Sequence, residues 1–160
     1  MAWSASAIFR EFVTDAIANA VAYDLSGTGV DTFKAALYNN SITPDKDSAL
    51  TGYNEATSQW VTANEVIDTT GGGTDWPSAG VALTSPAVTN PSTGVVMWDA
   101  SDTASGSTAD ISNANGCLVY DNTLAGTPGI CFNYFGGANS VTNGTFTIVW
   151  SANGLLRITV

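Results

Sequence analysis

The stretch GCLVYDNTLAGTPGICFNYFGG, residues 116–137, indicates the fold class of this chain. Two apolar segments, GCLVYDN and GICFNYFG, flank the turn-rich sequence DNTLAGTP. Short apolar runs bounded by Gly, Pro, Asn and Asp are typical of paired β-strands, since these residues supply the backbone angles of turns. We therefore expect an antiparallel hairpin here.

The only two cysteines of the chain, Cys117 and Cys131, flank this turn at equal distance from Leu124. A hairpin centred on Leu124 would place them opposite each other, close enough for a disulfide. Two interpretations stay open, a disulfide and a pair of small buried apolar residues. We do not expect a catalytic thiol, because the sequence offers no histidine or basic neighbour to lower the pKa of either cysteine.

The same alternation of strands and turns fills most of the chain. A period of two in DTFKAALYN places Phe33, Ala35 and Leu37 on one face, and a short strand is expected near Val66. Further strands are expected in GVALTSPAVT (80–89), GVVMWDAS (94–101), GTFTIVWS (144–151) and LLRITV (155–160). The last two should form a hairpin that turns at residues 151–154, with the final strand paired inside a sheet. The sequence thus predicts a mainly β fold, a single β-sandwich or barrel-like domain of short antiparallel strands over residues 26–160.

Residues 1–25 follow a helical period instead, and we expect them to form an N-terminal helix or docking arm. Ser4 or Ser6 should cap the helix. Apolar residues recur at spacings of three and four at Ile8, Phe9, Phe12, Val13, Ile17 and Val21. Charged side chains at positions 10, 11 and 15 interrupt this stretch, so we do not expect it to be a signal peptide. We therefore expect synthesis in the cytoplasm without a secretion signal.

Composition excludes several classes of function. The chain carries a net charge of −10, from 14 acidic and four basic residues, and contains no histidine. Nucleic-acid binding needs clustered Lys and Arg, and anionic membranes repel an acidic chain, so we expect neither partner. Without histidine, the usual nucleophilic triads and most zinc sites are excluded.

The remaining candidates for chemistry are carboxylates. Asp99 with Asp102 and Asp45 with Asp47 are the nearest acidic pairs, and a glycosidase would need such a pair. Both pairs lie in turn-like stretches, where Asp commonly bonds its own backbone, and we interpret them as turn residues. The stretch DKDSALTGYNE, residues 45–55, lacks the ligand spacing of an EF-hand, and a calcium site built from its loop oxygens stays an alternative.

Two further features are a glycine-rich loop and a pair of tryptophans. The loop TTGGGTDWPSAG, residues 69–80, lacks the Lys-Ser/Thr pair of a phosphate-binding loop. Trp60 and Trp76 either pack onto the sheet or lie exposed, where they could stack on sugars or contact a protein. We expect no enzyme, no catalytic residues, no cofactor and no metal.

Several stretches together resemble a family of small structural proteins of tailed-bacteriophage virions. They cover most of residues 31–160, in matching order and spacing: DTFKAALYNNSITPDKD (31–47), ANEV (63–66), GVALTSPAVT, the hairpin segments of 116–137, and SVTNGTFTIVWSANGLLRIT (140–159). Residues 69–80 form a longer loop than the family pattern has, and the N-terminal stretch is less characteristic.

The resemblance implies a capsid decoration (cement) protein in the virion, assembled in the host cytoplasm. Its partner would be the outer surface of the major capsid protein shell, and it would be a homo-oligomer, with a trimer favoured. The alternatives are a tail or neck component, with residues 69–80 reaching a neighbouring subunit, and a host-surface carbohydrate-binding module that uses Trp60 and Trp76. Each of these functions works by contact.

Overall fold

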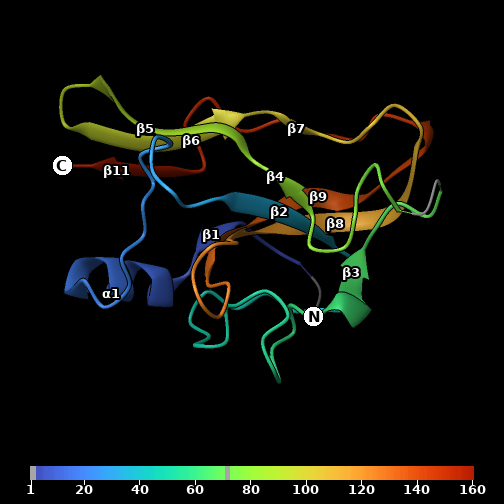
Figure 1. Ribbon diagram of the computed structural model, residues 1–160, viewed down its shortest axis with the longest axis horizontal. Coiled ribbons are helices and arrows are strands. Elements are labelled where there is room, and N and C mark those ends of the chain that lie inside the picture. Colours follow the sequence, from blue (N-terminus) through green and yellow to red (C-terminus); the bar gives the residue numbers. More distant parts are fainter. Residues whose placement is uncertain (1–2, 71–72) are drawn as a thin grey trace.

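A computed structural model describes residues 3–70 and 73–160 (Figure 1). It confirms a mainly β fold with antiparallel sheets and one short α-helix near the N-terminus of the described chain, and its strands do not close into a barrel. The helix is α1 (Arg10–Ala18), and one turn of 3-10 helix spans Thr62–Asn64. No helix of the described residues has the length and apolar character that crossing a membrane requires.

The strands form three sheets. The large sheet has the order β1-β9-β8-β2-β3, with β4 also paired to β2. Its strands are β1 (Ala7–Ile8), β2 (Phe33–Tyr38), β3 (Glu65–Val66), β4 (Val81–Ala82), β8 (Ala109–Asp121) and β9 (Gly129–Gly144). The small sheet has the order β11-β6-β5. Its strands are β5 (Thr84–Ser92), β6 (Val95–Ser101) and β11 (Leu156–Thr159). The two-stranded sheet pairs β7 (Thr103–Ala104) with β10 (Thr147–Ile148).

The hairpin expected at residues 116–137 is confirmed as part of β8 and β9, but its register is shifted. Cys131 lies opposite Val119, and Cys117 lies opposite Asn133. Both cysteines are buried and free, so they pack as small apolar residues. The prediction that they face each other is wrong for two reasons: the Tyr120–Gly129 pair beside the turn is already one position off a hairpin centred on Leu124, and a bulge between Val119 and Tyr120 adds a second position.

The last two strands do not form a hairpin with each other, as the sequence had indicated. Instead β10 pairs with β7 and β11 pairs with β6, so residues 147–159 run beside residues 95–104 as one interrupted antiparallel partner. The turn at residues 151–154 is confirmed by a bond of 2.7 Å from the Gly154 N–H to the Ser151 carbonyl. This turn separates β10 from β11 without pairing them with each other. The final strand pairs in a sheet as expected.

The N-terminal stretch begins as a strand and becomes helical only at Arg10. β1 pairs with β9, and the Phe9 N–H donates to the Ile130 carbonyl at 3.0 Å. The predicted serine cap is wrong: Phe9 is the N-cap without a side-chain bond, and the Ser6 Oγ accepts the Tyr134 N–H instead. Ser6 is therefore used to dock the N-terminal segment to β9.

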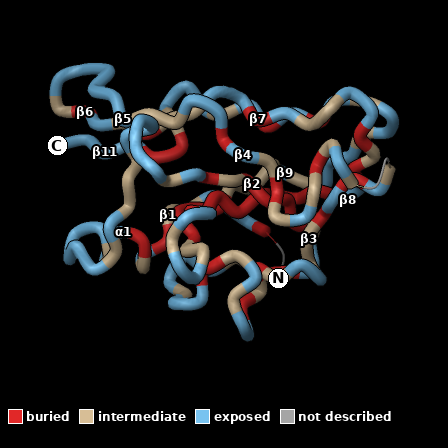
Figure 2. The backbone as a smooth tube through the Cα atoms, in the orientation of Figure 1, coloured by how far each residue is buried: buried red, intermediate tan, exposed pale blue. Residues whose placement is uncertain are grey.

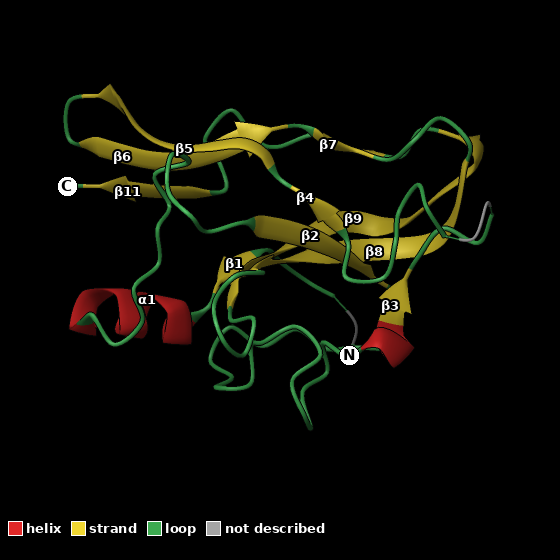
Figure 3. Ribbon diagram, in the orientation of Figure 1, coloured by secondary structure: helices red, strands yellow, loops and turns green. Residues whose placement is uncertain are grey.

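The core lies against β2, β8 and β9, where burial is densest (Figure 2). The long loop between β2 and β3 covers one side of this sheet (Figure 3). Its Trp60 is the centre of an aromatic cluster and contacts rings from four other parts of the chain at centroid distances of 5.1–5.9 Å: Trp3, Phe9, Tyr38 and Phe132. On the other side, Phe33 packs edge-on against Trp98 at 5.0 Å and joins the large sheet to the small one.

Candidate functional site

The acidic pairs considered from the sequence have separate structural roles. The Asp45 Oδ1 accepts the Asp47 N–H at 2.9 Å, which closes a turn, and Asp47 pairs with Lys46 at 2.8 Å. The Asp102 Oδ1 accepts the Trp150 N–H at 3.0 Å. Asp99 lies within β6, so the turn interpretation is wrong for that residue. Among the described residues, no cluster of three or more His, Cys, Asp or Glu could hold a metal ion.

Trp60 and Trp76 are both fully buried, which confirms the interpretation that they pack onto the sheet. Trp76 contacts Phe146 edge-on at 5.7 Å. A sugar-stacking surface made from Trp60 and Trp76 is therefore ruled out, because neither ring reaches solvent.

The described part of the glycine-rich loop is held by a buried carboxylate that the sequence analysis did not single out; residues 71 and 72 lie outside the described residues. The Asp68 Oδ1 accepts the N–H groups of Thr70 and Asp110 at 3.0 and 2.9 Å, and its Oδ2 accepts the Asp75 N–H at 3.4 Å. These backbone bonds hold the pKa of Asp68 below its ordinary value. Asp68 thus ties the loop to β8.

A second carboxylate, the half-buried Glu65, accepts three hydrogen bonds from the protein's own donors. Its Oε2 accepts the hydroxyls of Tyr53 and Ser78 at 2.9 and 3.0 Å, and its Oε1 accepts the Ala79 N–H at 2.8 Å. Burial raises the pKa of Glu65. Since both oxygens are already engaged within the fold, this cluster is a brace between loops and offers no catalytic arrangement.

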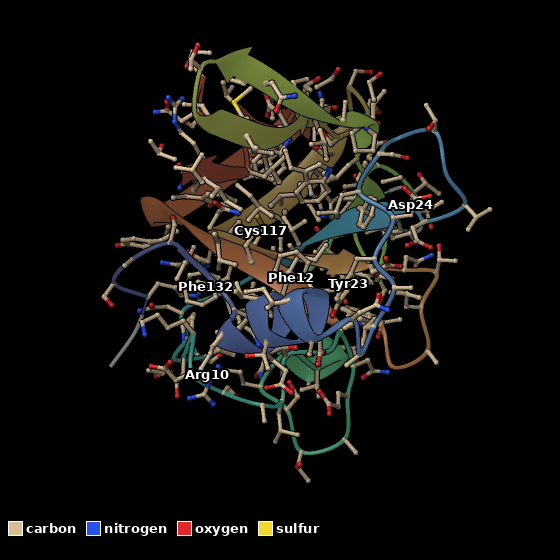
Figure 4. The ribbon with its side chains drawn as sticks, turned by 90° about the vertical axis from the view of Figure 1, so that its left-hand side faces the viewer. Arg10, Phe12, Tyr23, Asp24, Cys117 and Phe132 are labelled. Carbon is tan, nitrogen blue, oxygen red and sulfur yellow. The ribbon has the colours of Figure 1, made fainter. Side chains whose placement is uncertain are left out.

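An apolar groove lies on the surface between α1 and the small sheet. It has a volume of about 240 Å³ and is lined by ten residues, none of them polar or charged: Phe12, Val13, Ala16, Ile17, Leu25, Val88, Val96, Trp98, Leu156 and Ile158. We call these ten residues the α1 groove. Figure 4 looks at this end of the molecule, with α1 in front and the small sheet above it.

Strand register explains why one wall of the α1 groove is apolar. Val88 and Leu156 both lie opposite Trp98, and Ile158 lies opposite Val96, so two rows of apolar side chains cross the small sheet on one face. The first row, Val88, Trp98 and Leu156, contains two buried residues, Trp98 and Leu156. The second row, Val96 and Ile158, remains partly exposed to solvent.

The other wall is the apolar stripe of α1. Only Phe12 of this helix is buried; it packs on Tyr23 with a centroid distance of 4.9 Å. The other two large apolar residues of the helix, Val13 and Ile17, face water. Five groove residues are large exposed apolar side chains, with exposed fractions of 82% at Ile17, 59% at Ile158, 45% at Val88, 40% at Val13 and 39% at Val96. Exposed apolar clusters of this kind mark interaction surfaces.

A second hollow, of about 360 Å³, lies beside β9. Tyr134, Phe135 and Asn139 line it, together with residues 146–149. It differs from the α1 groove because aromatic rings and amide or hydroxyl groups meet there.

Comparison of the chain with protein-family models, with curated proteins and with solved structures returns no match.

Proposed function

We propose that this chain is a structural protein of a bacteriophage virion that decorates the capsid and binds the outer surface of the major capsid protein shell. The observation that carries a contact function is the α1 groove, an uncharged apolar surface on a chain of net charge −10. The resemblance of residues 31–160 to small virion proteins supplies the identity of the particle. An acidic protein also suits the outside of a capsid, because it does not compete for the packaged DNA.

The mechanism would be burial of surface, repeated over symmetry-related sites. A specific interface of roughly 1,600 Å² is sufficient for a stable complex. Linking several such contacts in a homo-oligomer multiplies the strength of attachment, since each later contact forms within an already bound assembly. A decoration protein of this kind needs rigid contact surfaces and no catalytic residues.

The first experiment is to count copies of this chain in purified particles by quantitative mass spectrometry, with the major capsid protein as internal standard. Hundreds of copies per particle, in a simple ratio to the capsid protein, are expected for a decoration protein. A few to a few tens of copies would instead indicate the neck, the tail or a host-recognition position. Absence from the particles would contradict a virion function altogether.

A second candidate function, recognition of host glycans, is favoured by the hollow beside β9. Aromatic faces at Tyr134 and Phe135 could stack on sugar rings, and the Asn139 amide could bond a hydroxyl. Glycan-array binding by the isolated protein, lost in Tyr134→Ala and kept in an α1 variant such as Ile17→Glu, would support it. An array without signal would leave the contact function as the better account.

A further inference from the structure

We propose that the α1 groove is the site at which a second copy of this chain binds, with the β11 strands of the two copies side by side and antiparallel. This inference does not rest on the capsid proposal; it assigns the groove to contact between copies, so that another surface would meet the shell, and it replaces the trimer implied by the resemblance with a dimer. Three observations carry it: the size of the exposed apolar surface, the distribution of charge, and the free edge of the small sheet.

The size of the apolar surface matches one side of a homodimer interface. The exposed parts of Val13, Ile17, Val88, Val96 and Ile158 together amount to roughly 500 Å². A standard interface buries about 800 Å² per partner, and in homodimers about 65% of that area is apolar. The groove therefore already carries the apolar share that a dimer of this kind requires.

The distribution of charge is compatible with self-association at this face. The chain has 14 acidic residues, so two copies repel each other at most orientations. None of the ten groove residues is acidic. Glu11 and Asp15 of α1 line a different hollow, together with residues from the loop around Gly52, and so do not face the groove. The groove lining itself therefore brings no carboxylate against a carboxylate, although Asp24 lines an adjoining hollow that shares Leu25 with the groove.

The free edge of the small sheet gives the contact a direction. β11 is the outer strand in the order β11-β6-β5, so one side of its backbone pairs with β6 and the other side meets no strand of the described chain. It contains no proline and one charged residue, Arg157, so it lacks most of the devices that protect edge strands. Antiparallel pairing with a second β11 would satisfy that edge and continue the apolar row of Val96 and Ile158 across both copies.

The experiment is to measure the mass of the full chain in solution by light scattering and sedimentation over a range of micromolar concentrations. We expect a concentration-dependent species of twice the 16.4 kDa chain mass. Ile17→Glu on α1 and Ile158→Glu on β11 should each raise the dissociation constant by on the order of 100-fold, because each places a carboxylate in the buried apolar interface. Val149→Glu is the matched control. Val149 is 72% exposed and lies outside the groove, and the substitution adds the same charge as the two test variants.

Salt supplies an independent readout. Because both partners carry a net charge of −10, screening by NaCl should tighten the dimer, whereas added NaCl would weaken a contact with a basic partner.

Circular dichroism would establish that the variants fold. Using two variants on different elements keeps the test valid if one of them fails to fold. A wild-type monomer at every concentration, a stable trimer, or a dimer that folded variants of both elements leave intact would overturn the proposal.

Discussion

The buried Asp68 and the half-buried Glu65 respond to opposite influences on their protonation. Asp68 accepts several backbone N–H groups, which favour the charged form and lower its pKa. For Glu65, loss of water dominates and raises the pKa, although three donors partly offset that effect. The largest effect on Asp68 comes from backbone N–H groups of β8 and of the loop that follows Asp68, whereas the largest effect on Glu65 is its loss of water.

Asp68→Asn should lower the melting temperature at pH 7, because the amide cannot accept bonds at both of its terminal atoms. The pKa of Asp68 in the folded state lies below 3.8, so its stabilising effect is fully present above pH 3.8 and is lost as the pH falls through the lowered value. The difference in melting temperature between wild type and variant should therefore shrink below that pH. Thermal melts from neutral to strongly acidic pH test this, and a difference that stays constant would contradict the assigned role.

The control for this prediction is Asp45→Asn. Asp45 is exposed and closes a turn that asparagine also supports, so the melting temperature should change little at any pH. A comparable loss in both variants would mean that the effect comes from the overall charge of the chain and not from the Asp68 bonds.

The two cysteines should be unreactive in the folded protein. Burial raises the pKa of Cys131 to about 12 and that of Cys117 well above its ordinary value, so almost no thiolate is present at pH 8. Titration with a chromogenic disulfide reagent should detect almost no thiol in the native protein and two per chain after unfolding without reductant. Absence of thiols after unfolding would instead reveal a disulfide.

At the scale of elements, local pattern predicted where most strands lie but not always their partners. β2, β6, β11 and the arms of the 116–137 hairpin follow from short apolar runs and the turn residues between them. The one-position bulge at Val119 could not be predicted, because it depends on packing of the paired strand. The partners of β10 and β11 could not be predicted either. A turn such as residues 151–154 can join two strands that pair with each other, or two strands that both pair with an earlier part of the chain, as they do here.

Leu156 and Ile158 lie on the same face of β11 but should differ in their contribution to stability. Leu156 is buried beside Trp98, so Leu156→Ala should lower the free energy of unfolding by about 2–4 kcal/mol. Ile158 is mostly exposed in a single copy, so Ile158→Ala should lower it by less than about 1 kcal/mol. Urea unfolding in dilute solution, where copies do not associate, measures both values. Equal losses would show that Ile158 is covered within one chain.

For the whole molecule, the N-terminal stretch belongs partly to the core and partly to the surface. Trp3 and Phe9 pack into the aromatic cluster around Trp60, whereas Val13 and Ile17 face the α1 groove. The helical stripe was visible in the sequence, and so was its apolar character. The opposite wall was not, because Val88, Val96 and Ile158 are distant in the chain and share a face only through strand register. A division of the chain at residue 25 stays a prediction.

If the N-terminal stretch is integral to the fold, Phe9→Ala should destabilise the whole protein. Phe9 is fully buried against Trp60 and Phe132, and its replacement by Ala should lower the free energy of unfolding by about 3–5 kcal/mol, a large share of the 5–15 kcal/mol typical of a domain. Ile17→Ala, on the exposed side of α1, should change it by no more than about 0.5 kcal/mol in the monomer. Urea unfolding followed by tryptophan fluorescence and by circular dichroism should give one coincident transition for each protein, displaced only in Phe9→Ala. If Phe9→Ala left the transition unmoved, residues 3–9 would be a dispensable arm, and the cluster around Trp60 would be held by the remainder of the sheet alone.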